Sequence, residues 1–171
     1  MFKEAINNYL HTHGYESIDL KAVLFDMDGV LFDSMPNHAE SWHKIMKRFG
    51  FGLSREEAYM HEGRTGAATI NIVFQRELGR EATQEEIESI YQEKSVLFNS
   101  YTEAERMPGA WELLQKIKNE GLVPMVVTGS GQLSLLERLE HNYPGMFHKE
   151  LMVTAFDVKY GKPNEWPTFL I

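Results

Sequence analysis

Three aspartates stand within eight positions of one another in the stretch "KAVLFDMDGVLFDSMPNH", residues 21–38. They are Asp26, Asp28 and Asp33, and they follow directly on an apolar run. An apolar strand is a poor place to gather carboxylates, because like charges repel strongly away from water. A carboxylate is already ionised at neutral pH, so it can act as a nucleophile without an activating base. Carboxylate oxygens also suit Mg²⁺, which prefers oxygen ligands.

Other catalytic patterns fail on residue type or spacing. The chain has no cysteine, which excludes disulfides, thiolate metal sites and cysteine nucleophiles. His61 and Glu62 begin a zinc-protease pattern, but Thr65 stands where the second histidine is required. The stretch "TGSG" lacks the Gly-Lys-Ser/Thr of a P-loop, and "GSGQ" lacks the elbow of serine hydrolases. The aspartates therefore remain the main chemical signal.

The order of predicted elements indicates an α/β fold. We expect a helix over residues 1–14, docked on the core, and a buried strand over 21–26. Helical spacing and capping patterns then fill the stretch up to residue 105. Beyond it, helix and strand patterns alternate over residues 108–121, 122–128, 132–143 and 150–156. This alternation predicts an incomplete Rossmann-like parallel sheet with an inserted α-helical cap. The core and the cap are assigned to residues 1–33 with 106–171 and to residues 34–105.

Polar side chains stand where each predicted strand ends. Asp26 ends the first strand, Thr128 ends the second, and Lys162 follows the third. In an open parallel sheet, ligands bind beyond the carboxyl ends of the strands. We therefore expect these three side chains to meet at one site.

Three motifs carry a family resemblance. "DMDGVLFDS" resembles the nucleophile motif of the haloacid dehalogenase superfamily, "VVTGS" its second motif and "KYGKP" its third. Their order and the position of the helical insert resemble the β-phosphoglucomutase-like subfamily, over roughly residues 20–164. The resemblance implies Mg²⁺-dependent phosphoryl transfer on a small phosphorylated substrate, through an aspartyl-phosphate.

The resemblance also implies roles for the motif residues. Asp26 would attack phosphorus and Asp28 would act as general acid and then base, with both holding Mg²⁺. Contacts to the phosphate would come from Thr128, Gly129, Ser130 and Lys162. We expect Asp33 to cap the following helix instead of taking part in the reaction.

Four residues of the predicted cap resemble substrate contacts of this family. His38 has a spacing from Asp26 similar to that of a histidine in β-phosphoglucomutase that acts on the general acid. The others lie in the loop "HEGRTG" and on the last cap helix, and they are Glu62, Arg64 and Lys94. The alternative for each is an ordinary surface role, since Arg, Lys and Glu are usually exposed.

The chain departs from the family pattern after "GKP". A further helix and strand and a fourth, acidic motif are expected there, but no carboxylate follows Glu165. The missing strands would leave the first strand on an exposed edge, which predicts self-association. We therefore expect a truncated product or a fragment that is poorly active alone. Phosphatase, sugar-phosphate mutase, pyrophosphatase and inactive remnant stay open as alternatives.

Composition limits the partners. The net charge of −8 disfavours nucleic acid, whose phosphates require Lys and Arg. No apolar run approaches the roughly 18–20 residues that span a bilayer, and the first residues lack the apolar core of a signal peptide. We expect a cytoplasmic protein without membrane contact.

Overall fold

The computed structural model describes residues 2–131, 135–158, 161 and 162 of the 171-residue chain. The start of the predicted helix 132–143 and part of the predicted loop 157–164 lie outside the described residues. The α-helices are α1 Phe2–His13, α2 Met35–Arg48, α3 Arg55–Met60, α4 Gly66–Leu78, α5 Gln84–Asn99, α6 Ala110–Asn119 and α7 Leu135–Asn142. The strands are β1 Ala22–Phe25, β2 Val123–Val127 and β3 Met152–Val153.

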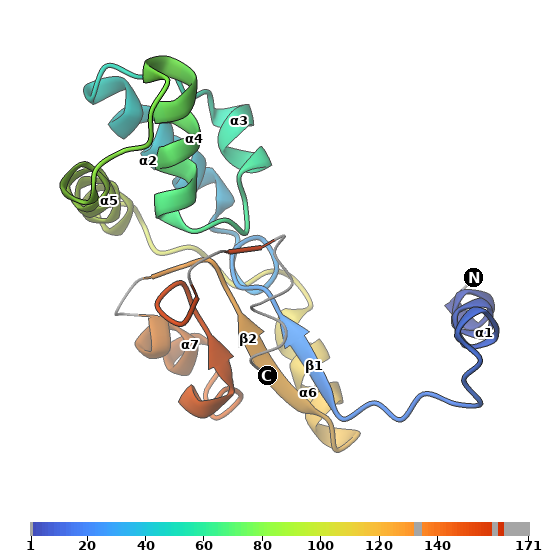
Figure 1. Cartoon of the computed structure of the whole chain (residues 1–171). Helices are drawn as coiled ribbons and strands as arrows, with labels where there is room; N and C mark the ends of the chain where they lie inside the picture. Colours follow the sequence, from blue (N-terminus) through green and yellow to red (C-terminus); the bar gives the residue numbers. More distant parts are fainter. Residues whose placement is uncertain (1, 132–134, 159–160, 163–171) are drawn as a thin grey trace.

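The strands form one parallel sheet in the order β1-β2-β3 (Figure 1). Ala22 pairs with Val123, and Val126 pairs with Met152 on the other side of β2. All helices of the cap are inserted between β1 and α6, so β1 and β2 are neighbours in space and distant in sequence. Parallel neighbours require such crossover connections. The predicted α/β fold with a Rossmann-like sheet and an inserted helical segment is confirmed.

One apolar cluster joins the sheet to α6 and α7. Leu114 of α6, Val126 of β2 and Leu139 of α7 are almost completely buried in it. Tyr143, which follows α7, is fully buried, and its hydroxyl donates a hydrogen bond to the carbonyl of Leu31. That hydroxyl therefore ties the far end of the core to the loop that follows β1.

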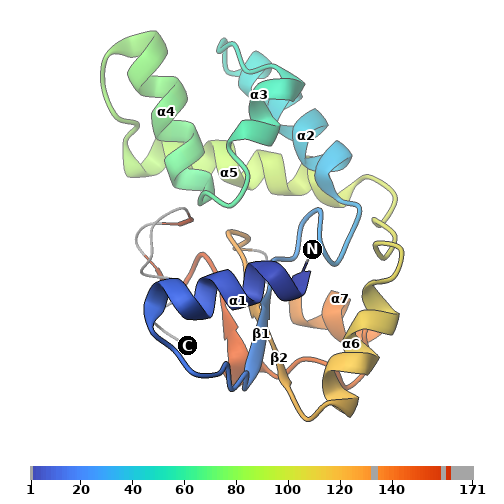
Figure 2. The same ribbon diagram turned by 90° about the vertical axis from the view of Figure 1, so that its right-hand side faces the viewer.

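A second apolar cluster holds α2, α3, α4 and α5 together as a separate layer (Figure 2). Ile45, Ile70 and Ile90, one each from α2, α4 and α5, are buried at its centre. Local signals fix the helix ends. Thr83 begins α5 in a reciprocal capping box with Glu86, whose carboxylate accepts from the Thr83 N–H.

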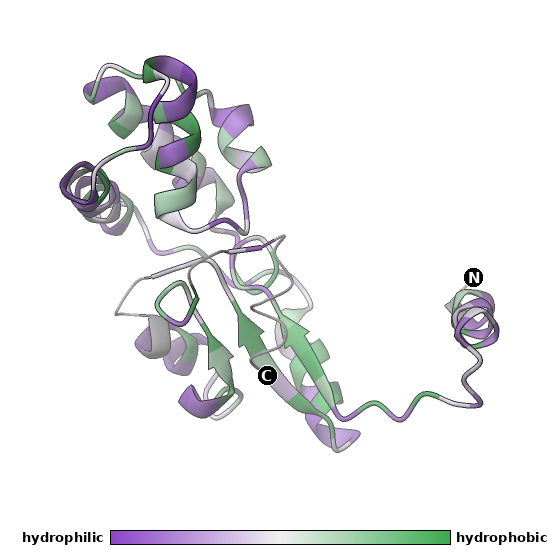
Figure 3. Ribbon diagram, in the orientation of Figure 1, coloured by the Kyte–Doolittle hydropathy of each residue, from purple (hydrophilic) through white to green (hydrophobic). Residues whose placement is uncertain are grey.

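The expected docking of the first helix on the core is wrong. Figure 1 shows α1 standing apart from β1, at the end of an extended connection whose residues 14–20 are all exposed. Ile6 and Tyr9 remain 48% and 49% exposed. The Tyr9 ring instead stacks on His13, at 4.3 Å between ring centroids. Figure 3 shows that this helix is mostly polar. Its narrow apolar stripe is enough to predict a helix, but it does not determine what the helix packs against.

The predicted strand over residues 150–156 is also wrong for most of its length. A turn of 3-10 helix, η1 Lys149–Leu151, precedes β3, which has only two residues. The Asp157 carboxylate ends the strand, because it accepts hydrogen bonds from the N–H and the hydroxyl of Thr154, both at 2.8 Å. This local turn competes with extended backbone.

Among the described residues, β1 has no strand on its outer side, and Leu24 is 41% exposed there. Self-association through this edge stays a prediction. Within the same residues, none of the helices combines the length and apolarity that crossing a membrane requires.

Changing Tyr143 to Phe removes one hydroxyl and keeps the buried ring. The Leu31 carbonyl keeps a second donor, the N–H of Met107 at 2.9 Å, so we expect a loss of about 1 kcal/mol in the free energy of unfolding. Urea denaturation measures this loss. The same change at half-exposed Tyr9 should stay within about 0.5 kcal/mol of the unsubstituted chain. Equal losses in the two variants would contradict the role of the Tyr143 hydroxyl.

Candidate active site

The carboxyl ends of β1 and β2 form the base of the site. Asp26 directly follows β1, and its Oδ1 lies 2.7 Å from Nζ of Lys162. The Lys162 ammonium also donates to the carbonyl of Val127 at 3.1 Å, and Val127 precedes Thr128 at the end of β2. One ammonium therefore contacts both strand ends and offsets the charge of Asp26. The structure therefore brings Asp26 and Lys162 together beside the end of β2, whereas the convergence of the Thr128 side chain on them stays a prediction.

The loop after Asp26 turns sharply and buries Asp28. Gly29 has φ 77°, a left-handed conformation that favours glycine, and its N–H donates to the carbonyl of Phe32 at 2.8 Å. The hydroxyl of Ser34 donates to Asp28 Oδ1 at 2.5 Å. The turn thus faces Asp28 toward the start of α2.

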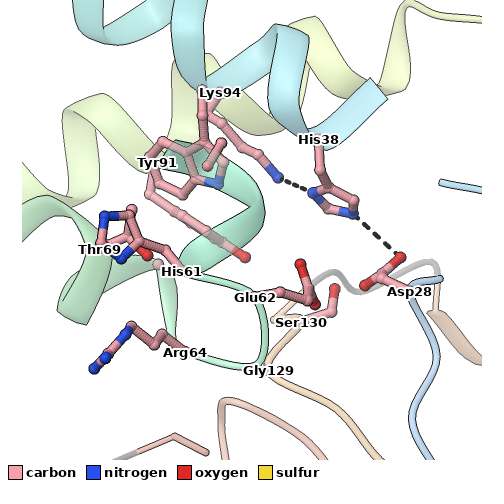
Figure 4. Close-up of a pocket in the computed structure, with 13 residues that line it drawn as sticks. Asp28, His38, His61, Glu62, Arg64, Thr69, Tyr91, Lys94, Gly129 and Ser130 are labelled. Atoms are coloured by element: carbon pink, nitrogen blue, oxygen red, sulfur yellow. Dashed lines mark hydrogen bonds and ion pairs between the residues drawn. The ribbon is translucent and has the colours of Figure 1, made fainter. Parts of the chain in front are cut away.

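Asp28, His38 and Lys94 form a chain from the core into the cap (Figure 4). His38 Nε2 lies 3.2 Å from Asp28 Oδ1, and His38 Nδ1 lies 2.7 Å from Lys94 Nζ. An ammonium can only donate, so His38 Nδ1 accepts and its proton sits on Nε2, facing Asp28. Burial and then the Lys94 charge lower the pKa of His38, which keeps the imidazole neutral.

The same contacts set the charge of Asp28. Burial alone would raise its pKa, but His38, Ser34 and Lys94 together outweigh burial and lower it. Asp28 is therefore a carboxylate at neutral pH in this arrangement. Lys94 is only 2% exposed, and burial lowers its pKa to about 8 against the opposing effect of Asp28. The ring centres of Trp42 and Phe98 lie 5.4 and 4.8 Å from the Lys94 ammonium, and both rings stabilise its charge through cation–π attraction.

Glu62 enters the site from the loop between α3 and α4. The residue as a whole is exposed to solvent, but Figure 4 shows its carboxyl group beside Ser130 and facing Asp28. Desolvation and then the charge of Asp28 raise the pKa of Glu62 to about 7. Glu62 can therefore gain or lose a proton near neutral pH.

Two cavities meet at this loop. Asp28, Ser130 and Lys94 line one, while Asp26 and Lys162 line the other. Glu62 and Arg64 line both, so the loop divides the two aspartates. The Ser130 hydroxyl is buried and has no hydrogen-bond partner among the described residues, and it is free to bind a substrate oxygen. Thr128 is buried too, and its hydroxyl accepts from the N–H of Ser130 at 3.1 Å.

Glycines let the cap loop rest directly on the core. A Cβ on Gly129 would lie 2.7 Å from the carbonyl oxygen of Arg64, and one on Gly161 would lie 2.7 Å from the nitrogen of Thr65. Both distances are too short for a side chain. The hydroxyl of Tyr91 adds a cap-to-core contact, since it accepts from the N–H of Gly131 at 3.3 Å.

Asp33 does not have the helix-capping role expected of it. Ser34 is the N-cap of α2, and no side chain caps that helix end. Asp33 is exposed, and its side chain makes no hydrogen bond within the described residues. Proline near the first turn removes one N–H that a cap would satisfy. The hydrogen bond from Ser34 to Asp28 was not foreseen from the sequence, although a hydroxyl six residues after Asp28 could have indicated it.

The four cap residues differ in placement. His38, Glu62 and Lys94 point into the pocket, whereas the guanidinium of Arg64 points away from Asp28 (Figure 4). The substrate contact expected of Arg64 stays a prediction. Tyr91 was not recognised from the sequence, because a tyrosine on a helix carries no signal of its own.

The donor set fits a Mg²⁺ ion that keeps most of its water. Among the described residues, no group of three or more His, Cys, Asp or Glu side chains is arranged so that it could hold a metal ion by itself. Asp26 Oδ1 is occupied by Lys162 and by the Met27 N–H at 2.8 Å, which leaves its second carboxylate oxygen for a ligand. Mg²⁺ is commonly held by one or two carboxylates together with waters and substrate phosphate.

A parallel sheet, an inserted helical cap and a strand-end aspartate beside a lysine are the arrangement that the three sequence motifs led us to expect. The sequence model of haloacid dehalogenase-like hydrolases matches residues 20–168, and the chain belongs to that family. This confirms the resemblance drawn from the motifs.

Individual relatives cover the same region. Hexitol phosphatase A of Escherichia coli is 29% identical over 145 residues, which are 84% of this chain and 63% of the relative. A phosphorylated carbohydrates phosphatase of Thermotoga maritima is 25% identical, over 85% of this chain and 66% of the relative. The solved structure of a candidate β-phosphoglucomutase from Bacteroides vulgatus is 78% identical, with a TM-score of 0.93 over 99% of this chain and 68% of that one. The chain thus spans about two thirds of these relatives.

Substitution of Gly129 by Ala should lift the cap loop from the core. The added methyl group would overlap the main chain of Arg64, so we expect faster hydrogen exchange at the amides of residues 63–65. Mass spectrometry measures that exchange. The matched control is Gly52→Ala, whose methyl group would meet only the Glu77 side chain at an ordinary 3.7 Å. Unchanged hydrogen exchange in the Gly129 variant would contradict the close contact between the cap loop and Gly129.

The Glu62 carboxyl should titrate near pH 7 in carbon-detected NMR spectra. Asp28→Asn removes a neighbouring negative charge, so the midpoint should fall, whereas Asp33→Asn should leave it unchanged. In the folded chain the pKa of the Glu62 carboxyl lies above its ordinary value of 4.5, so the carboxyl keeps its proton to a higher pH. The contribution of Glu62 to stability therefore falls as the pH rises from about 4.5 to about 7. A midpoint near 4.5 in the unsubstituted chain would contradict the burial of this carboxyl.

Proposed function

We propose that this chain carries the site of a Mg²⁺-dependent phosphatase, which hydrolyses a small phosphorylated sugar or polyol through an aspartyl-phosphate on Asp26. The observation that carries the proposal is the 2.7 Å contact between Asp26 and Lys162 at the ends of two parallel strands. The names of the two curated phosphatase relatives support the substrate class.

In the first step, a carboxylate oxygen of Asp26 forms a bond to phosphorus, and the bond from phosphorus to the leaving oxygen breaks. The leaving oxygen takes a proton from Asp28. Because Asp28 is ionised without substrate, it must first take that proton from solvent, and the negative charge of a bound phosphate favours this by raising the pKa of Asp28. His38 and Ser34 hold the Asp28 carboxyl in place for the transfer.

In the second step, Asp28 takes a proton from water, and the water oxygen attacks the aspartyl-phosphate. The bond between Asp26 and phosphorus breaks, which regenerates the carboxylate and releases inorganic phosphate. The close contact of the cap loop with Gly129 and Gly161 keeps other water away from the intermediate.

Charge is the main difficulty of the first step. Two unit negative charges about 4 Å apart cost roughly 4 kcal/mol at an effective dielectric constant near 20. Lys162 opposes that repulsion, and the buried hydroxyls of Thr128 and Ser130 offer donors to phosphate oxygens. When bound, Mg²⁺ would supply further positive charge, held by the Asp26 carboxylate and the main-chain carbonyl of Asp28.

A sugar-phosphate mutase is the second candidate, favoured by the description of the Bacteroides vulgatus neighbour. A mutase returns the phosphoryl group to another hydroxyl of the substrate, whereas a phosphatase gives it to water. Product analysis separates the two, since only the phosphatase releases one inorganic phosphate for each substrate consumed.

Asp26→Asn should abolish phosphate release, because the amide cannot form the aspartyl-phosphate. We expect release by the unsubstituted chain with Mg²⁺ on a panel of hexose and polyol phosphates, with pyrophosphate included, measured by a phosphate assay. Chelation of Mg²⁺ should remove this activity. Asp33→Asn is the matched control, since this exposed side chain contacts no group of the site, and its activity should stay within about twofold.

One result would overturn the enzyme reading for this chain. If no substrate of the panel gives phosphate above the Asp26→Asn level, the chain alone is an inactive remnant. The same panel repeated with a longer chain, which adds the part of the relatives that this chain does not cover, would then show whether that part supplies groups needed for the reaction.

A further inference from the structure

A third cavity lies at the hinge between the cap and the core. Its walls are the start of α2 at Asn37, the end of α5 at Phe98, the connection at Tyr101 and Glu103, and the core helix α7 at Arg138. We call it the hinge cavity, and its volume is about 220 Å³. It shares no lining residue with the pocket that holds Asp28, so it is separate from the candidate active site.

Two polar groups in the hinge cavity lack partners. Arg138 Nε and the Tyr101 hydroxyl are buried, and neither has a hydrogen-bond partner among the described residues. The Arg138 side chain is 14% exposed, and the nearby Glu103 Oε1 lies 3.8 Å from its Nε, too far for a hydrogen bond. A buried donor without an acceptor costs free energy. A bound molecule that brings acceptor oxygens would remove this cost.

The local charge favours an anion. The Glu103 side chain is 52% exposed, so water screens its charge, whereas the Arg138 charge is largely shielded from water. The Arg138 guanidinium lies 4.8 Å from the centre of the Phe32 ring and 5.8 Å from that of Phe98, and these rings hold its plane. A guanidinium plane matches the oxygens of a carboxylate or a phosphate, and Tyr101 adds an O–H donor.

The hinge cavity is physically linked to the active site. The Phe98 ring that lies under Arg138 also packs on the His38 ring, with 4.2 Å between the ring centroids. An occupant of the cavity would contact residues of both the cap and the core, since Phe98 belongs to α5 and Arg138 to α7. Binding there would therefore act on the position of the cap and on the surroundings of His38.

We propose that the hinge cavity is a second binding site, which takes the carboxylate or phosphate group of a small metabolite on Arg138 and Tyr101. The volume of about 220 Å³ lies below the roughly 300–1,000 Å³ of pockets for drug-sized ligands, which restricts the occupant to a small molecule. The site does not depend on the proposed phosphatase activity, because its residues take no part in that reaction.

The test is an NMR titration of the ¹⁵N-labelled chain with inorganic phosphate and, separately, with acetate. We expect saturable shifts of the amides of Thr102, Glu103 and Arg138 with at least one anion, and the tighter anion identifies the group preferred. Arg138→Gln should abolish these shifts. Phosphate should still move the amides of Gly129 and Ser130 in that variant, which shows that the fold and the active site remain.

Two milder variants guard against a general loss of structure. Tyr101→Phe keeps the ring and should weaken binding about three- to tenfold, the effect of one lost hydrogen bond. Glu103→Gln removes an opposing charge and should tighten binding, while Glu105→Gln, on the same connection, should not. The proposal is overturned if the hinge amides do not shift, if their shifts do not saturate, or if they persist in Arg138→Gln. Weaker binding in Glu103→Gln would likewise overturn it.

Discussion

The buried contact of Lys94 with His38, and of His38 with Asp28, is the constraint on which the rest of the site depends. It joins a cation of the cap to an anion of the core through a neutral imidazole, and the Lys94 and Asp28 side chains are both largely removed from water. A buried charge is tolerated only when an opposite charge compensates it. Asp28 can therefore keep its ionised, oriented state only while α2 and α5 stand over the sheet.

The same closure places Glu62 between the two catalytic candidates. The loop that carries Glu62 rests on Gly129 and Gly161, and any larger residue at either position would hold it away. Asp26 then faces one cavity and Asp28 the other. In the proposed reaction a substrate would bring its phosphorus to Asp26 and its leaving oxygen to Asp28, which would require the cap loop to move between binding and reaction.

Phe98 connects the two sides of the hinge. The Phe98 ring lies close to His38 and Lys94, and it also lies close to Arg138 of α7. An aromatic ring shared by two cations transmits a change at one side to the other, because tightly packed contacts do not deform independently. The hinge cavity is therefore separated from His38 by the ring of Phe98.

The sequence by itself determined the elements and the motif positions. The helix start at Thr83 followed from local capping chemistry. The two strands that end before Asp26 and Thr128, and the approach of Lys162 to these strand ends, followed from parallel-sheet topology. The family likewise followed from three motifs in order. These properties depend on neighbours along the chain or on a general rule of sheets.

Only the tertiary structure decided how side chains from distant segments pair. It directed Ser34 toward Asp28 and left Asp33 exposed, and it held α1 away from the core despite its apolar stripe. It also lowered the pKa of Lys94 and raised that of Glu62, because burial and neighbouring charge act through space. Residue type and spacing carry no record of which groups lose contact with water, and that loss sets the chemistry of this site.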